Sequence, residues 1–138
     1  MNIIPARDIR SVLIDGGITV PIFINQEQDT GPFPALTIRR YGGAANPHWA
    51  RDQILLQVRC KGEAFGAESA EELLYQTRDI LLGLETIKFL PEYDYIRFLL
   101  VSDVAYIGVD DENRPIFTLN FEVTVDWKIP VGNREPIN

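Results

Sequence analysis

The sequence contains very few of the residues that build active sites. Its 138 residues include one cysteine, Cys60, and one histidine, His48. A single thiol cannot form an internal disulfide, and these two residues cannot supply the ligands of a typical structural zinc site. Cys60 falls in the apolar set of an expected strand, which indicates a buried, inert thiol rather than a nucleophile. We therefore expect no enzyme, no cofactor and no metal centre.

Basic residues and long apolar runs are also scarce. Thirteen lysines and arginines stand against 20 acidic residues, which gives a net charge of −7. Such a chain repels nucleic-acid phosphates, and its one adjacent basic pair, Arg39-Arg40, is expected to point to opposite faces of a strand. No apolar run approaches the ~18 residues that span a membrane, and the N-terminal residues do not have the pattern of a signal peptide. We expect neither specific DNA binding nor a membrane partner.

The chain has instead the composition of one globular domain. Hydrophobic residues make up 46% and charged residues 24% of the sequence. A chain of this length can bury a core without disulfides or metals, so we expect a single domain over residues 1–138. Its last part, residues 128–138, contains Pro130, Gly132 and Pro136, and is expected to form an extended C-terminal tail.

The hydrophobic periodicity predicts seven elements in the order α-β-β-β-α-β-β. The expected helices cover residues 5–15 and 69–82, and the expected strands cover residues 20–24, 35–41, 53–61, 96–109 and 115–127. Ser69 and Glu72 have the spacing of a capping box at the start of the second helix. This order predicts an α+β fold, with a mostly antiparallel sheet and two helices on one face.

The final strand has the clearest pattern. Apolar and polar residues alternate strictly along it, so its register is well specified. The apolar positions are Phe117, Leu119, Phe121, Val123, Val125 and Trp127, and the polar positions are Thr118, Asn120, Glu122, Thr124 and Asp126. We expect the apolar set to hold the sheet against the second helix.

Loop residues supply the candidate interface positions, because exposed aromatics and arginines often anchor protein contacts. They are Phe33, Trp49, Arg51, Asp110, Asp111 and Glu112. Trp49 is expected either in an interface or against its own core, and Phe33 is expected to pack on the domain. The three acidic residues form a hairpin tip. We expect this tip to be exposed to solvent, and binding of a divalent cation is the less favoured alternative.

The order of these landmarks resembles that of the tail terminator proteins, also called tail completion or minor tail proteins, of bacteriophages with long non-contractile tails. The resemblance covers roughly 120 residues. It consists of a helix ending at Gly16-Gly17, the strand 20–24, the run 33–38, Gly42-Gly43, the strand 52–62, the helix 67–83 and the long terminal strand with its partner.

The resemblance implies a structural virion protein without enzymatic activity. Copies would form a ring, usually a hexamer, that caps the head-proximal end of the tail tube, stops polymerisation of the tube protein and docks the head connector, while DNA passes through the lumen. The expected contacts are the strand 20–24, the loops 25–34 and 42–52, the tip 110–114, and a patch made by Trp49 and Arg51. The extended tail 128–138 is expected to reach a neighbouring subunit. The polar face of the terminal strand would border the lumen or a neighbouring subunit.

Two other functions are left open by the sequence. The first is a neck, or head–tail joining, protein of similar fold, which differs in the partner that it binds. The second is a small ligand-binding or enzymatic domain with an apolar pocket beneath the sheet near His48. A tail location in the virion, after assembly in the cytoplasm of the host bacterium, follows from the resemblance.

Overall fold

A computed structural model of the protein describes residues 6–27, 30–45, 48–83, 93–128 and 130–136. These described residues fold into two helices and five strands, in the order that the sequence predicts. The elements are α1 (Ala6–Asp15), β1 (Ile22–Ile24), β2 (Ala35–Ala45), β3 (Arg51–Lys61), α2 (Ala67–Leu82), β4 (Tyr93–Val109) and β5 (Pro115–Trp127).

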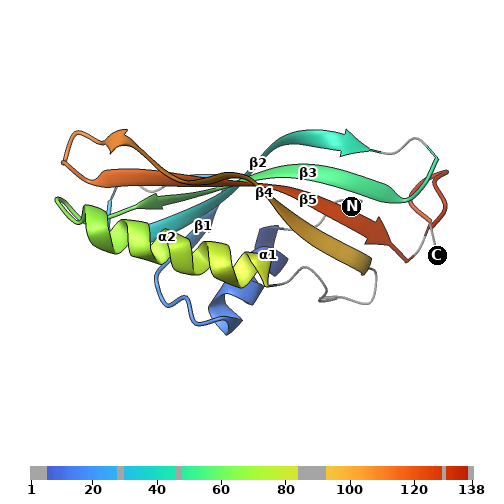
Figure 1. The fold of residues 1–138 in the computed structure, drawn as a ribbon, viewed down its shortest axis with the longest axis horizontal. Coiled ribbons are helices and arrows are strands. Elements are labelled where there is room, and N and C mark those ends of the chain that lie inside the picture. The colour runs from blue at the N-terminus through green and yellow to red at the C-terminus, as the bar shows by residue number, and fades with distance from the viewer. Residues whose placement is uncertain (1–5, 28–29, 46–47, 84–92, 129, 137–138) are drawn as a thin grey trace.

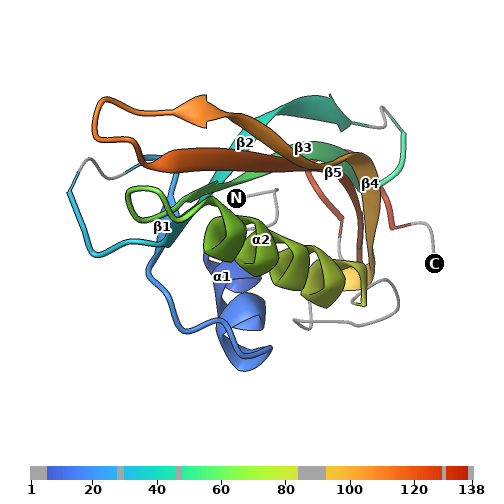
Figure 2. The ribbon, with the colours of Figure 1, turned by 60° about the vertical axis from the view of Figure 1, so that its left-hand side comes forward.

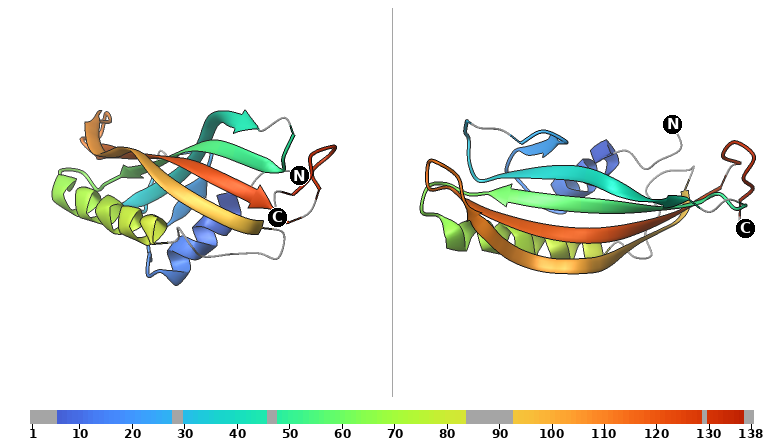
Figure 3. Two further views of the ribbon diagram at one scale, coloured as in Figure 1. Left: turned by 45° about the vertical axis from the view of Figure 1, so that its right-hand side comes forward. Right: turned by 90° about the horizontal axis from the view of Figure 1, so that it is seen from above.

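The five strands form one sheet in the order β1-β2-β3-β5-β4 (Figure 1). Among the five strands of the described residues, β1 is the one that pairs in parallel, and it pairs with Leu36–Ile38 of β2. The other three pairings are antiparallel and join the long strands side by side, as the view from above shows (Figure 3). The predicted α+β class with a mostly antiparallel sheet is confirmed.

Both helices lie on the same face of the sheet (Figures 1 and 2). Helix α2 packs on β3, β4 and β5, while α1 lies beside β1 and β2. The buried face of α2 consists of Ala70, Leu74, Thr77 and Leu81. Ile9 and Leu13 are the buried residues of α1. The sheet therefore has one covered face and one face without helices.

The alternation of β5 is realised as predicted. All six of its apolar residues from Phe117 to Trp127 are buried, at 0 to 6% exposure. Because β5 is flanked by β3 and β4, it lies inside the sheet and its apolar face meets α2. This strand connects the hairpin tip to the opposite end of the molecule, so it fixes the position of surfaces at both ends.

The predicted break after Tyr41 is wrong. Strand β2 continues to Ala45, and β3 begins at Arg51, so most of the expected loop 42–52 belongs to strands. The cause is a bulge between Arg40 and Gly43, where the register shifts. A Cβ atom on Gly43 would lie 2.0 Å from the carbonyl oxygen of Gln53, so the glycine allows two strands to approach closely. The glycine pair shifts the register and does not end the strand.

The predicted capping box of the second helix is also wrong. Helix α2 begins at Ala67 with Gly66 as its N-cap, and no side chain donates or accepts a capping hydrogen bond there. Ser69 therefore lies within the first turn. The predicted end at Gly83 is confirmed, because its backbone N–H donates to the carbonyl oxygens of Asp79 and Leu81. Residue 5, the expected first residue of the first helix, lies outside the described residues.

Candidate interaction surfaces

The hairpin tip between β4 and β5 is held by Asp110. One carboxylate oxygen accepts hydrogen bonds from the backbone N–H groups of Glu112 and Arg114, at 2.9 and 3.0 Å. The other accepts from the Arg114 guanidinium at 2.6 Å and lies 3.3 Å from the Lys61 ammonium. Asp110 is thus committed to the turn, while Asp111 and Glu112 are exposed at its apex.

These contacts determine the charge state of Asp110. Burial raises the pKa of the carboxyl, but the Arg114 backbone, the Arg114 guanidinium, the Glu112 backbone and the Lys61 ammonium outweigh it. Together they hold the pKa of Asp110 well below its usual range. Asp110 is therefore an ionised structural residue at neutral pH.

Phe33 joins the same cluster from the loop before β2. The central carbon of the Arg114 guanidinium lies 4.4 Å from the centre of the Phe33 ring, and the Lys61 ammonium lies 6.0 Å from it. Such cation–π contacts stabilise an aromatic ring against its own domain. The half-buried Phe33 side chain agrees with the prediction that it packs on the domain.

Trp49 and Arg51 lie at the opposite end of the sheet. Trp49 has 48% of its surface exposed. The Arg51 guanidinium makes a two-pronged pair with the Asp126 carboxylate, at 2.6 and 2.9 Å. The paired geometry fixes the direction of Arg51 and leaves the Trp49 side chain as the larger open contact area.

The C-terminal segment, residues 130–136, folds back on this end of the sheet. The backbone N–H of Ala50 donates to the carbonyl oxygen of Glu135 at 2.7 Å. Arg134 donates to the buried Asp52 carboxylate at 2.8 Å, and the Trp127 indole donates to the same carboxylate at 2.9 Å. Val131 is buried. In this structure the segment lies on its own domain, and its predicted contact with a neighbouring subunit stays a prediction.

The six candidate interface residues therefore form two groups. Phe33 and the acidic tip lie near the Lys61 end of β3, whereas Trp49 and Arg51 lie near its start. Eleven residues of β3 separate the two ends, about 30 Å at a rise of ~3.3 Å per residue. No single partner residue can touch both groups.

The polar face of β5 is less acidic than its own sequence indicates. Its cross-strand neighbours on the face without helices include Arg51 beside Asp126 and Arg59 beside Thr118. On the other side Arg97 lies beside Thr124. Thr118 and Asp126 are themselves buried. The sheet register thus mixes arginines with the carboxylates of β5.

Sequence reasoning missed Phe65, which has 85% of its surface exposed and is the most exposed large apolar residue in the described part of the chain. Its backbone is left-handed, with φ of 62°. Its N–H donates to the carbonyl oxygen of Asn113 at 3.0 Å, so the loop before α2 is tied to the hairpin tip. Beside it lies a hollow of about 460 Å³, whose walls include Tyr106, Val109 and Phe117. In the sequence only its two glycines, Gly62 and Gly66, mark this segment as a loop.

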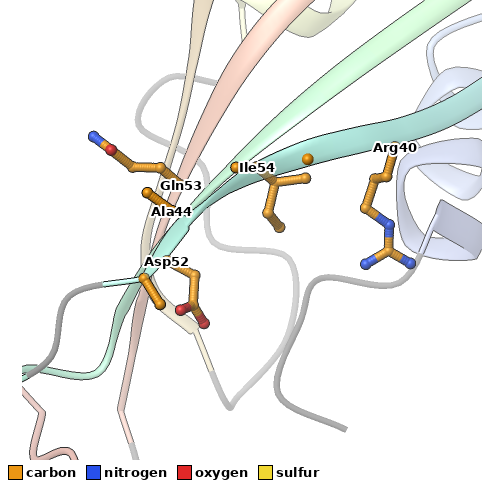
Figure 4. A pocket seen from close by; sticks show the side chains of 8 residues that line it. Arg40, Ala44, Asp52, Gln53 and Ile54 are labelled. Atoms are coloured by element: carbon orange, nitrogen blue, oxygen red, sulfur yellow. The ribbon is translucent and has the colours of Figure 1, made fainter.

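A second hollow lies at the β2 edge, near the start of β3. It measures about 410 Å³ and is lined by Arg40, residues 42–45 and residues 52–54; we call it the edge hollow. In Figure 4 Arg40, Asp52 and Ile54 point to the same side of the sheet. The Nη1 atom of Arg40 is buried and has no hydrogen-bond partner among the described residues. This site could not be recognised in the sequence, because the glycine pair 42–43 suggests a loop where the structure has a strand with a bulge.

Cys60 is fully buried, as predicted. Burial raises the pKa of its thiol to about 12, which keeps it protonated. Within the described residues no cluster of three or more His, Cys, Asp or Glu side chains has the arrangement to hold a metal ion. The same part of the chain contains no helix that is long and apolar enough to cross a membrane.

Comparison with known proteins identifies one family. The sequence model of the family described as bacteriophage tail terminator protein matches residues 11–127. The match runs from within α1 to the last residue of β5, so it includes the whole sheet and α2. No curated protein shows significant sequence similarity to the chain.

Proposed function

Since the chain belongs to the bacteriophage tail terminator family, we propose that copies of it form a ring that caps the head-proximal end of the phage tail tube. The ring stops polymerisation of the tube protein and gives the head connector a surface to dock on. The observation that carries this proposal is the family match over residues 11–127, which covers nearly every element of the fold. The family is one of structural tail proteins, and the role proposed is likewise non-catalytic.

A ring made of one kind of chain needs two unlike contact surfaces on each copy. The domain supports such an arrangement, because its two ends differ in chemistry. One end has the acidic apex of Asp111 and Glu112, and the other has the exposed Trp49 beside the ion-paired Arg51. We assign contacts with neighbouring copies, the tube protein and the connector to these ends. A ring of six copies is the order we propose.

DNA passes through the centre of the proposed ring without specific binding. The net charge of −7 per chain supports this, because a lumen lined by acidic subunits does not hold phosphates. The polar face of β5 borders the lumen or a neighbouring subunit in this arrangement. Arg51, Arg59 and Arg97 on the same sheet face limit the repulsion near that strand.

The proposed location is the head-proximal end of the virion tail, reached by assembly in the cytoplasm of the host bacterium. The test is electron microscopy of particles produced without this protein. We expect tails of uncontrolled length that lack heads, because nothing stops addition of tube subunits. Finished tails of normal length with attached heads would refute the proposal. Tails of normal length that fail to join heads would point instead to a neck protein.

A further inference from the structure

The loop between β3 and α2 presents a rigid apolar projection. Phe65 is the tip of this loop, and Glu63 and Ala64 beside it are also exposed. A bulky residue with φ of 62° is unusual, because left-handed backbone favours glycine. Such strain persists where the surroundings fix it, and here the hydrogen bond to Asn113 does so. Strained, exposed and anchored aromatic residues are typical of contact sites.

The charge around Phe65 is negative. Glu63 lies two residues before it and Glu68 three residues after it, and both side chains are exposed. The nearby cations Lys61 and Arg114 already contact Asp110. A partner that receives Phe65 should therefore combine an apolar recess with a cation that still has bonding capacity.

The edge hollow has both properties. Its walls are mostly small or apolar, namely Gly42, Gly43, Ala44, Ala45 and Ile54. At its margin the Arg40 guanidinium has one buried nitrogen without a partner among the described residues. The Arg40 side chain as a whole is half-buried and lines the hollow, so a carboxylate that enters the hollow can approach the accessible part of this cation.

Phe65 cannot reach the edge hollow of its own chain. The Phe65 loop follows the end of β3, while the hollow lies around residues 52–54 at its start. Most of an 11-residue strand separates them, roughly 30 Å at ~3.3 Å per residue. Contact between these two surfaces therefore requires a second copy.

We propose that Phe65 of one copy inserts into the edge hollow of the next copy, where Glu63 or Glu68 pairs with Arg40. The inference rests on the proposed ring and names the contact that builds it. The two surfaces differ, so the contact is head-to-tail, and repetition around an axis closes a ring. The cation and the ring of Phe65 also attract each other directly.

Cysteine pairs test the proximity. Ala44 lines the edge hollow and Ala64 adjoins Phe65; both are exposed. The full chain carrying Ala44→Cys and Ala64→Cys is treated with a short bis-maleimide at high protein concentration and analysed on a denaturing gel. Buried Cys60 adds no background. We expect a ladder of covalent oligomers that ends at the ring order. Each single-cysteine variant should stop at or below the dimer.

Phe65→Gly in the same double-cysteine background tests the aromatic anchor. Glycine accepts the left-handed backbone, so the melting temperature should stay equal or rise. The ladder should nevertheless fall by roughly tenfold to a hundredfold, as for loss of an interface anchor. Ile14→Ala, which removes an exposed apolar side chain from α1, is the matched control and should leave the ladder unchanged. No ladder, or a ladder that Phe65→Gly leaves intact, overturns the contact.

Charge exchange tests the pairing of carboxylate and guanidinium. Arg40→Glu alone, and Glu63→Arg with Glu68→Arg alone, should each abolish the ladder through repulsion between like charges. An equimolar mixture of the two variants should restore it, because copies then alternate around a ring of even order. Misfolded variants could not restore each other. Failure of the mixture to assemble contradicts the inference.

The outcomes separate this contact from the proposed function. If particles without the protein have tails of uncontrolled length but no cross-linked ladder forms, the terminating role is supported and the Phe65 contact is refuted. A ladder combined with normal finished tails would keep the contact and remove the terminating role.

Discussion

At the residue scale, Asp110 shows that a carboxylate at an exposed hairpin tip can form its hydrogen bonds and ion pairs within its own domain. A strongly polar turn is what the sequence predicts at 110–114, and its acidic residues are equivalent candidates for contacts. The structure separates them, because Asp110 accepts from Arg114 and from the N–H of Glu112, whereas Asp111 stays at the apex. Three of these contacts of Asp110 are local, with Glu112 and Arg114, and the Lys61 ammonium adds a contact from a residue that is distant in the sequence.

Asp110→Asn should lower the free energy of unfolding at pH 7. The native pKa of Asp110 lies below its ordinary value of about 3.9, so the ionised side chain stabilises the fold above that pH. This stabilisation is lost as the pH falls through the native pKa. Urea denaturation of both proteins should therefore show a difference that is full at pH 7 and shrinks below about pH 4.

Asp111→Asn is the matched control, because it removes the same charge from the same turn at an exposed side chain. It should change the free energy of unfolding little at any pH. The electrostatic explanation would be contradicted if the difference in unfolding free energy between the wild type and Asp110→Asn were the same at pH 2 as at pH 7.

At the scale of elements, regular periodicity was predictable and irregular backbone was not. The alternation in β5 specifies its register and its buried face, because each apolar side chain would meet water after a slip of one residue. The glycine pair at 42–43 is ambiguous, because glycine marks loops and bulges alike. The start of α2 differs from the prediction because Ser69 and Glu72 have the spacing of a capping box, whereas the helix begins at Ala67 with Gly66 as its N-cap.

The fold of the C-terminal segment depends on contacts that no local pattern contains. Arg134 and Asp52 are 82 residues apart in sequence, yet their side chains bond directly. Proline and glycine in this segment predict irregular backbone, which residues 130–136 have. They do not indicate where the segment lies, because its position depends on the Arg134–Asp52 ion pair, the burial of Val131 and the backbone bond between Ala50 and Glu135.

Arg134→Ala should destabilise the protein by about 1–3 kcal/mol, since Asp52 keeps its buried carboxylate and loses a charged donor. Trp127 remains as a donor to that carboxylate and limits the loss. Urea denaturation at neutral pH measures the change. Lys128→Ala, which removes an exposed cation near the same end, should have little effect. Equal effects of the two substitutions would show that the pair with Asp52 contributes nothing specific.

At the scale of the whole molecule, the sequence predicted the family and fold but not the arrangement of surfaces. Exposure of a side chain depends on which elements cover it. Trp49 and Phe33 have similar loop contexts, yet Phe33 packs against Arg114 while Trp49 is half exposed. The proposed contact of Phe65 with Arg40 likewise depends on the positions of the two surfaces at opposite ends of β3, which no sequence pattern shows.

Trp49→Ala should weaken ring assembly while changing the free energy of unfolding by less than ~1 kcal/mol, because the side chain is half exposed. Sedimentation of the full chain measures the mass in solution, with tail tubes added if the wild type is monomeric alone. Phe33→Ala is the comparison, and it should reduce stability through the lost contacts with Arg114 and Lys61. Rings that form unchanged from Trp49→Ala would remove this residue from the interface.

The environments of the two tryptophans give the protein two optical reporters. Trp127 is buried and donates to the Asp52 carboxylate, whereas Trp49 has 48% of its surface exposed. Emission from Trp127 should therefore follow unfolding, and emission from Trp49 should follow its removal from water. An aqueous quencher should reach Trp49 and spare Trp127. Folding and subunit contact can thus be recorded from the same unlabelled chain, at two wavelengths of its own fluorescence.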